Sequence, residues 1–219
     1  ILFVPGLLYE ASVRARNGLY SSGLLPCRRL PGTVISVGNI TMGGTGKTPL
    51  VLYIAKALTR HGCQSAILTR GYKRSRSSAT LVLSPGETAS QAAVSLGDEP
   101  AVMRRHLPHA WMGISGNRFL AGSAICRRLR TPVFILDDGF QHRRLHRDLD
   151  IVILDGSQRL QSNRVFPRGT LREPVSGLRR SDIVIINGSG PGGSAGPIAE
   201  AVRTLAPQAS IFRCTQAIE

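Results

Sequence analysis

A glycine-rich segment at residues 38–49, GNITMGGTGKTP, has the residue types and spacing of a phosphate-binding loop. Its glycines at positions 43, 44 and 46 carry no Cβ, so backbone N–H groups can turn toward an anion. An apolar run precedes the segment and a stretch of helical periodicity follows it, which would aim the positive end of a helix at the same anion. The alternative, a glycine-rich turn with an accidental Lys–Thr pair, leaves this order of elements unexplained. The segment therefore predicts binding of nucleotide phosphates.

Two side chains after the glycines suit the chemistry of a nucleoside triphosphate. Lys47 can neutralise the β- and γ-phosphates, and the Thr48 hydroxyl can ligate magnesium. The loop departs from the strict pattern, which has glycine where this chain has Thr41. We expect the nucleotide to be bound by eight consecutive residues: Thr41, Met42, Gly43, Gly44, Thr45, Gly46, Lys47 and Thr48.

A pair of carboxylates, Asp137 and Asp138, directly follows the apolar run 133–136. At a strand end in a phosphate-loop domain, such carboxylates hold magnesium directly or through water. Apolar strands also often end in Asp at a turn, so the pattern gains its meaning from the phosphate loop. Asp155 ends a similar run, but a Gly–Ser turn follows it, and we expect it to cap that turn. Asp137, Asp138 and the Thr48 hydroxyl are thus the predicted magnesium ligands.

Short apolar runs that alternate with helical periodicity must position these side chains. The runs VFIL, IVIL and IVII are too apolar for half-exposed strands, which indicates a parallel sheet buried on both faces. Strands are expected at residues 33–37, 66–69, 81–83, 111–114, 133–136, 151–154, 183–186 and 211–214. Helices are expected at residues 50–60, 98–106, 119–129 and 198–205. The predicted fold is α/β, a mostly parallel sheet with flanking helices of the P-loop NTPase type.

The expected domain organisation has four parts. Residues 1–30 mix leucines and tyrosines with four arginines and one acid, which predicts an amphipathic, membrane-facing helix; a helix packed on its own domain fits equally well. Residues 31–186 form the P-loop domain. Residues 187–197, almost entirely Gly, Ser and Pro, are expected to be a hinge. Residues 198–219 are expected to be the incomplete start of a second, smaller α/β domain.

The chain is strongly basic for its 219 residues. It has 28 Lys and Arg against 13 Asp and Glu, a net charge of +15 at pH 7 and a sequence pI near 11.2. This balance predicts an anionic partner: a nucleic acid, an acidic lipid surface or a phosphorylated substrate. Aromatic residues make up only 5%, which argues against stacking on single-stranded nucleic acid. No apolar run approaches the roughly 18 residues of a transmembrane helix, and the four cysteines lack the paired spacing of a zinc site.

Several motifs spaced along most of the chain resemble the tetraacyldisaccharide 4'-kinase family of lipid A biosynthesis. The threonine at position 41 of the loop is what that family has there. The other matching segments are TRGY at 69–72, GDEP at 97–100, DDGFQH at 137–142, RD at 147–148 and LRE at 171–173. Several motifs in the right order are far more specific than the phosphate loop alone.

The resemblance implies an ATP-dependent kinase with ATP and Mg²⁺ as cofactors. It would transfer the γ-phosphate to the 4'-hydroxyl of an acylated glucosamine disaccharide 1-phosphate, as a peripheral or monotopic protein at the cytoplasmic face of the inner membrane. The partners implied are this lipid and the anionic membrane surface, with no nucleic acid and no protein partner. A basic protein surface suits both, because arginines bind lipid phosphates. The family also has a second domain whose histidine partners the catalytic aspartate, and none of the five histidines here is assigned that role.

The resemblance also gives roles to individual residues. Asp98 would be the general base that accepts the proton of the sugar hydroxyl, although the residues alone favour an N-cap ahead of Pro100. Lys47 and Asp138 complete the expected catalytic set. The residues expected at the substrate are Arg70, Tyr72, Arg118, His142, Arg172 and Glu173.

Two rival functions stay open at this point. A P-loop ATPase or GTPase acting as a switch or assembly factor would share the loop and the carboxylates, but the Asn-Lys-x-Asp element typical of guanine specificity is absent from the sequence. A non-enzymatic binder of nucleic acid or of an anionic membrane would explain the +15 charge. It would leave the phosphate loop and the aspartate pair without a role.

Overall fold

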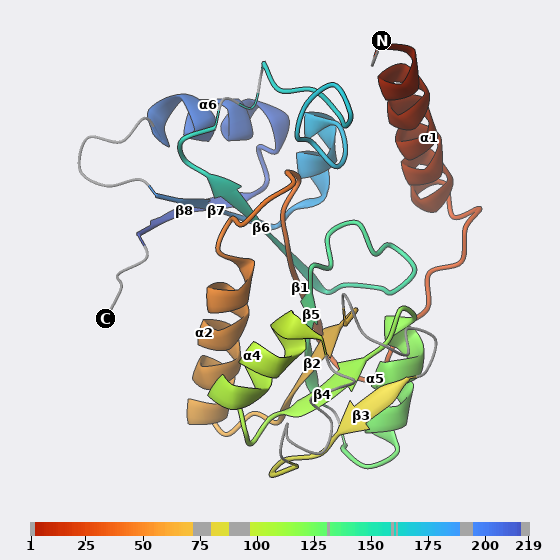
Figure 1. Ribbon diagram of the computed structural model, residues 1–219, viewed down its shortest axis with the longest axis vertical. Helices are drawn as coiled ribbons and strands as arrows, with labels where there is room; N and C mark the ends of the chain where they lie inside the picture. The colour runs from red at the N-terminus through yellow and green to blue at the C-terminus, as the bar shows by residue number, and fades with distance from the viewer. Residues whose placement is uncertain are drawn as a thin grey trace. The chain divides into compact units, whose positions relative to one another are not determined.

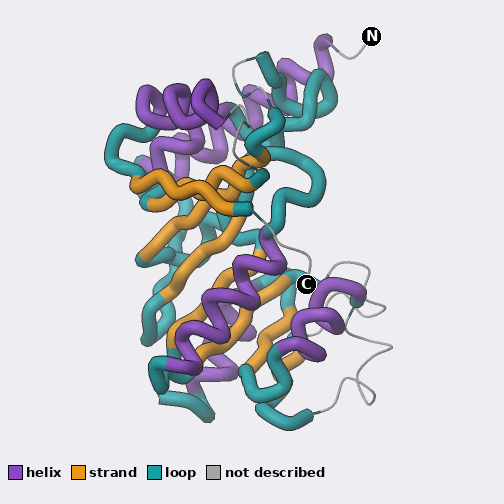
Figure 2. Tube along the Cα trace, turned by 90° about the vertical axis from the view of Figure 1, so that its left-hand side faces the viewer, coloured by secondary structure: helices purple, strands orange, loops and turns teal. Residues whose placement is uncertain are grey.

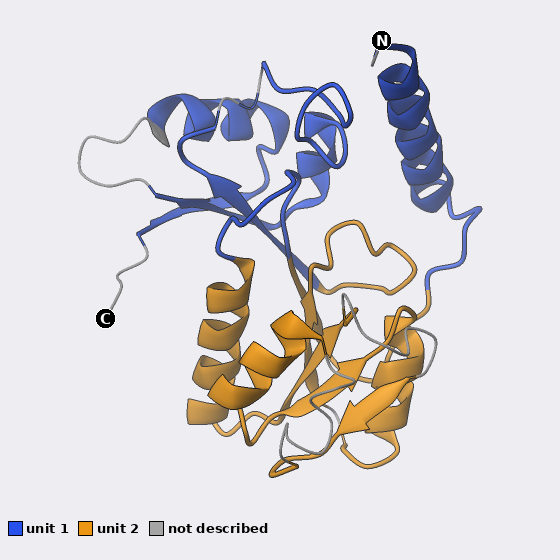
Figure 3. Cartoon of the chain, in the orientation of Figure 1, with its two compact units in different colours: residues 1–27, 38–46, 149–219 blue, residues 28–37, 47–148 orange. Residues whose placement is uncertain are grey.

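The computed structural model describes residues 3–71, 80–87, 97–130, 132–158, 160, 162–188 and 195–215. The chain forms two compact units, coloured separately in Figure 3. Unit 1 contains residues 1–27, 38–46 and 149–219, and unit 2 contains residues 28–37 and 47–148. Both units are built from strands and helices, and each is described by itself.

Unit 2 contains strands in the order β3-β4-β2-β5-β1 (Figure 1). Their bounds are Val34–Gly38 for β1, Ser65–Thr69 for β2, Leu81–Leu83 for β3, Trp111–Ile114 for β4 and Val133–Asp137 for β5. All these neighbours pair in parallel except β3 and β4, which are antiparallel. In the register of β2 and β5, Leu68 lies opposite Leu136, so the two strands end beside each other.

Both faces of this sheet are buried. One face forms a core cluster with α5 (Arg118–Cys126), and its members from β2, β5 and α5 are Ala66, Leu68, Phe134, Leu136, Ala121 and Ile125. The alternate positions Ile67 and Ile135 are also fully buried. Helix α2 (Lys47–Arg60) packs on β2 and β5 and against α4 (Asp98–His106), and Figure 2 shows helices lying over the strands. Because side chains alternate along a strand, Thr69 and Asp137 share the face of Ile67 and Ile135.

Unit 1 contains the parallel strands β6 (Leu149–Asp155), β7 (Ile183–Asn187) and β8 (Ser210–Cys214), paired in that order. Helix α6 (Ala195–Leu205) packs on β7 and on the 3₁₀ helix η1 (Val175–Arg180). Strand β8 is mostly exposed, whereas the central residues of β6 are buried.

Helix α1 (Phe3–Ser21) is attached to unit 1 by part of its surface only. The Tyr9 ring meets Phe166 edge to face with centroids 6.2 Å apart, and the Arg168 guanidinium lies 4.5 Å from the centroid of Phe3. Val4 and Leu8 nevertheless remain 62% and 68% exposed. The helix therefore both packs on its own unit and presents apolar side chains outward. Among the described helices, none has the length and hydropathy to cross a bilayer.

The predicted fold class is confirmed, since buried parallel strands alternate with helices as the apolar runs indicate. The helix expected at 119–129 instead ends at Cys126, because Arg128 N–H bonds to Ile125 O and tightens the last turn. Asn187, expected to open a hinge, is the last residue of β7. Residues 189–194 of that hinge lie outside the described residues. Residues 210–214 pair with β7 within unit 1, and the four-part domain organisation stays a prediction.

Candidate nucleotide and phosphoryl-transfer site

The phosphate loop follows β1 and leads directly into α2. Gly43 and Gly46 have φ of 106° and 92°, values that favour glycine. A Cβ added at Gly43 or Gly44 would meet nothing within 4 Å, so protein packing does not demand glycine there. Open space beside these two backbones is what a closely approaching phosphate requires.

Backbone hydrogen bonds tie this loop to the segment that carries two of the predicted substrate residues. Met42 N–H donates to Thr170 O at 2.7 Å, and Arg172 N–H donates to Ile40 O at 2.7 Å. These bonds bracket an antiparallel bridge between Thr41 and Leu171. The loop and the LRE motif are therefore one locally paired structure within unit 1.

Helix α2 brings the loop lysine to one of the strand-end carboxylates. Lys47 Nζ lies 3.5 Å from Asp138 Oδ1, and the Lys47 side chain is only 13% exposed. Asp138 has φ of 48°, so it leaves β5 in the left-handed conformation. The first turn of α2 holds no acidic residue. Its N-terminal N–H groups and the lysine therefore present positive charge to an anion.

The other strand-end carboxylate, Asp137, is almost completely buried. It is 3% exposed and accepts a hydrogen bond from Thr69 Oγ1 to Oδ2 at 2.9 Å. Burial raises the pKa of Asp137 to about 6, the bond from Thr69 opposes this shift, and the negative charges of Asp138 and Glu99 add to it. A cation beside this carboxylate would relieve the cost of keeping it ionised.

The donor set fits magnesium. The Thr48 hydroxyl and the carboxylates of Asp137 and Asp138 are hard oxygen ligands, and Mg²⁺ is usually held by one or two carboxylates together with phosphate oxygens and water. In the described part of the chain, no cluster of three or more His, Cys, Asp or Glu could hold a metal by itself.

A buried arginine lies in the same unit as this carboxylate pair. Arg118, the first residue of α5, is 6% exposed, and its Nη1 lies 3.5 Å from His142 Nδ1. Burial lowers the pKa of Arg118, nearby Arg70 lowers it further, and Asp138 and Asp137 oppose the shift. Among the described residues, the Nε of Arg118 is buried without a hydrogen-bond partner. Such a donor is satisfied when an anionic ligand binds.

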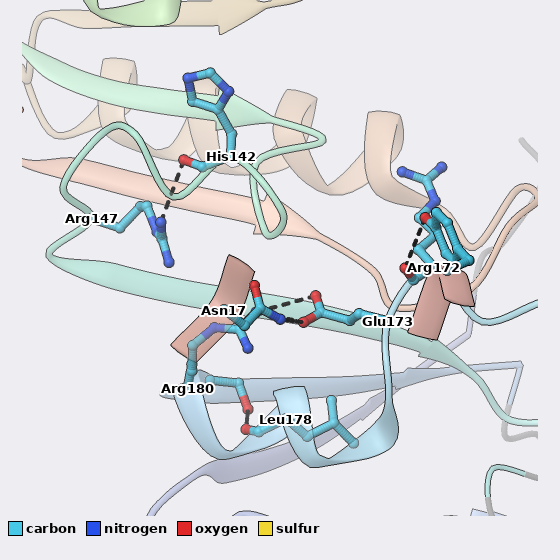
Figure 4. A network of polar contacts seen from close by, with 9 residues as sticks. Asn17, His142, Arg147, Arg172, Glu173, Leu178 and Arg180 are labelled. Carbon is cyan, nitrogen blue, oxygen red and sulfur yellow. Dashed lines mark hydrogen bonds and ion pairs between the residues drawn. The ribbon is translucent and has the colours of Figure 1, made fainter. Parts of the chain in front are cut away.

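Glu173 is held inside unit 1 by two elements (Figure 4). It is 1% exposed; Arg180 Nη2 donates to Oε1 and Oε2 at 3.1 and 2.9 Å, and Asn17 Nδ2 of α1 donates to Oε2 at 3.0 Å. Tyr9 of α1 also donates to the backbone O of Arg172 at 3.3 Å. The LRE motif is thus an anchor for α1, a role that the sequence did not indicate. Contact of Glu173 with substrate stays a prediction.

The remaining predicted residues are placed as follows. Asp98 is the first residue of α4 and is exposed, while Gly97 occupies the N-cap, so the N-cap alternative for Asp98 is wrong. Arg70 is exposed just after β2, and Tyr72 lies outside the described residues. The backbone O of His142 accepts a hydrogen bond from Arg147 at 3.4 Å (Figure 4).

Four polar residues that the sequence analysis did not select contact predicted site residues. They are Asn39, Thr69, Asn187 and Asn17. Three of them stand at or just after the carboxyl end of a strand, which is where open α/β sheets bind ligands. That position was the available signal, and it would have selected Asn39, Thr69 and Asn187.

The parallel sheet, the phosphate loop and the strand-end carboxylates define an α/β domain of the P-loop type. A YjiA GTPase variant with bound Zn(II), 15% identical with a TM-score of 0.51, shares this fold and shows nothing more. A family model described as tetraacyldisaccharide-1-P 4'-kinase, LpxK, matches residues 1–216. The chain belongs to this family.

Individual relatives agree with the family model. Tetraacyldisaccharide 4'-kinase from Geobacter sulfurreducens is 43% identical over 185 residues, which cover 84% of this chain and 52% of that protein. The Anaeromyxobacter dehalogenans relative is 42% identical over 210 residues, covering 94% of this chain and 55% of that protein. The crystal structure of Aquifex aeolicus LpxK in complex with ATP is similar, with a TM-score of 0.76, 41% identity, and coverage of 84% of this chain and 57% of that one. The chain spans about half the length of the curated relatives it matches.

Proposed function

We propose that this protein transfers the γ-phosphate of ATP to the 4'-hydroxyl of a tetraacyldisaccharide 1-phosphate, a step of lipid A biosynthesis. The observation that carries the proposal is the Lys47–Asp138 pair, which brings the lysine at the start of α2 to a strand-end carboxylate. Membership of the 4'-kinase family selects the acceptor. The ATP complex of the Aquifex aeolicus relative supports ATP as the donor.

The loop residues would cradle the triphosphate, and each nearby group has a distinct task. Residues 41–46 would donate backbone N–H groups, and Lys47 would hold charge that develops on the transferred phosphoryl group. Thr48, Asp137 and Asp138 would hold Mg²⁺, which when bound neutralises phosphate charge. Arg118, whose buried Nε has no hydrogen-bond partner among the described residues, would bind a phosphate oxygen of ATP or of the lipid.

Asp98 would be the general base that accepts the proton of the 4'-hydroxyl. Its exposed position at the start of α4 supports this role, because a substrate can reach it. Arg70, Tyr72, His142, Arg172 and Glu173 would contribute to binding of the sugar phosphate.

Lipid phosphorylation by purified protein tests the proposal. Radiolabelled ATP, Mg²⁺ and tetraacyldisaccharide 1-phosphate are supplied to this chain and, in parallel, to the full-length Aquifex aeolicus relative. We expect a labelled bisphosphorylated lipid from both proteins and no product from Lys47→Ala. Asp98→Ala should lower kcat with little change in ATP affinity. ATP hydrolysis at a rate that does not depend on the lipid would instead support a P-loop ATPase switch. Stimulation of ATP hydrolysis by single-stranded RNA would support a nucleic-acid binder.

The location of this activity is proposed to be the cytoplasmic face of the inner membrane. The exposed Val4 and Leu8 on α1, together with the +15 charge, support peripheral binding to anionic lipid. Leu8→Asp should weaken binding to phosphatidylglycerol vesicles in a sedimentation assay. Tyr53→Asp is the matched control, because Tyr53 on α2 is similarly exposed at 65%. Equal binding by both variants would contradict a role of α1 at the membrane.

A further inference from the structure

Two asparagines hold Thr45, the residue that precedes the last glycine of the phosphate loop. Asn39 Nδ2 donates to Thr45 Oγ1 at 3.1 Å, and Asn187 Nδ2 donates to the Thr45 carbonyl at 3.0 Å. We propose that Asn39 and Asn187 are positioning residues that preset the phosphate loop for the triphosphate. The proposal rests on the proposed function only in taking this loop as the nucleotide site.

Asn187 is fixed by the sheet before its side chain reaches the loop. As the last residue of β7, it lies in register between Asp155 of β6 and Cys214 of β8. Its backbone carbonyl accepts a hydrogen bond from Gly156 N–H at 2.7 Å. A side chain rooted in a paired strand is a more rigid support than one on a loop.

The bond to the Thr45 carbonyl orients the peptide group that joins Thr45 to Gly46. Because this group is planar and trans, fixing its carbonyl on one side fixes the Gly46 N–H on the other. Gly46 has φ of 92°, and a Cβ there would lie 2.8 Å from Asn187 Nδ2. Both this φ and the approach of the Asn187 side chain favour glycine at position 46, whereas Gly43 and Gly44 face open space.

Asn39 holds the side chain of the same threonine. It directly follows β1, and both Asn39 and Thr45 are buried, at 0% and 3% exposure. Thr45 is thus gripped at its hydroxyl by Asn39 and at its carbonyl by Asn187. Because both contacts are made within the protein, the loop is already ordered before ATP binds. The free energy of ATP binding is then not reduced by the cost of ordering the loop.

The Asn187 amide is used at both ends. While Nδ2 donates to Thr45, Oδ1 lies 3.6 Å from the Cys214 thiol, which can donate to it. An amide engaged in this way is oriented toward the loop backbone. The competing role for an asparagine at a strand end in a nucleotide-binding sheet is direct contact with the base. A residue that contacts the base would distinguish ATP from GTP, whereas a residue that positions the loop would affect both equally.

Nucleotide affinity separates the two roles. In Asn187→Asp, an isosteric variant, a carboxylate oxygen faces the Thr45 carbonyl and the donor is lost. We expect the Kd for ATP, measured by calorimetry, to rise about tenfold and the Kd for GTP to rise by the same factor. Asn39→Ala should also raise the Kd for both ATP and GTP. Gln208→Ala is the matched control: its side-chain amide donates to the backbone O of Arg179 at 2.6 Å in the same unit, and it should leave the Kd unchanged.

Hydrogen exchange in the nucleotide-free protein gives a second readout. Amides of residues 41–46 should exchange faster in Asn187→Asp, with unchanged exchange in β6 and β7. An unchanged Kd together with unchanged hydrogen exchange would overturn the proposal. A change in the ratio of the Kd for ATP to the Kd for GTP would also overturn it, because it would show that Asn187 contacts the base. A wild-type protein that binds ATP but phosphorylates no lipid would contradict the proposed function while leaving this test intact.

Discussion

Strands β5 and β6 carry nearly the same sequence signal and end in different structures. Each has a run of buried apolar residues followed by aspartate. Asp155, the last residue of β6, accepts hydrogen bonds from the N–H and hydroxyl of Ser157 at 2.9 and 2.7 Å. Asp137, at the end of β5, accepts from Thr69 across the sheet, and Asp138 faces Lys47. The first carboxylate closes a local turn, and the other two belong to the candidate site.

The difference comes from where the hydrogen-bond donors stand in the sequence. Ser157 is two residues from Asp155, so an Asx-type turn satisfies that carboxylate locally. Thr69 is 68 residues from Asp137 and reaches it through strand pairing. A strand-end aspartate that has no hydrogen-bond donor nearby in the sequence can instead accept from a distant residue or bind a ligand. The turn-capping prediction for Asp155 is confirmed by its contacts, and the metal-binding prediction for Asp137 and Asp138 stays a prediction.

The largest expected effect is the difference in kinase activity between variants at the ends of β5 and β6. Asp138→Asn should lower magnesium-dependent lipid phosphorylation about a hundredfold, because it removes a charge beside Lys47 and the proposed metal. Asp155→Asn should leave the rate within about twofold, since its contacts are within a turn. Initial rates across a magnesium titration measure both. Equal losses in the two variants would remove the distinction between the strand ends.

An intermediate effect concerns the stability of the magnesium-free protein. Because burial raises the pKa of Asp137 to about 6 from 3.8, the folded state binds this proton more tightly than the unfolded state. The contribution of this group to the free energy of unfolding therefore falls as pH rises from about 4 to about 6, and the penalty persists above that range. Asp137→Asn should remove the penalty, stabilising the protein at pH 8 by about 3 kcal/mol.

Urea denaturation in EDTA at pH 4 and pH 8 measures this difference. The advantage of Asp137→Asn over wild type should be small at pH 4, where Asp137 is protonated in the folded state and about half protonated in the unfolded state, and larger at pH 8. Asp155→Asn is the control, because the carboxylate of Asp155 is bonded within its own turn. A difference that does not change with pH would contradict the buried, ionisable environment of Asp137.

The smallest expected effect is on folding alone. Asp155→Ala removes the bonds from Ser157 and should lower the free energy of unfolding by about 1 kcal/mol. The affinity for ATP should not change, since these contacts lie within the turn. Thermal denaturation and calorimetry on the same sample check both parts. A loss of ATP affinity without a loss of stability would place Asp155 in the site rather than in the turn.

The sequence by itself determined the features that depend on neighbouring residues. Apolar runs located the strands, the glycine-rich segment located the loop between β1 and α2, and the Gly–Ser pair after Asp155 located a turn. These features follow from backbone conformation and from the period of side-chain burial, which act over a few residues. Asp98 shows the limit of such reasoning even locally, because Gly97 occupies the N-cap in its place.

Only the tertiary structure decided which polar side chains support the site. Asn187 looked like the start of a hinge, yet strand pairing makes it the end of β7, in contact with a loop more than a hundred residues earlier in the chain. Glu173 is buried against Asn17 and Arg180, contacts that the sequence did not indicate, and its predicted contact with substrate stays a prediction. A sheet brings distant strand ends to one edge, and burial then requires each polar group there to find a partner. Those partners depend on strand order and register, which no local pattern in the sequence specifies.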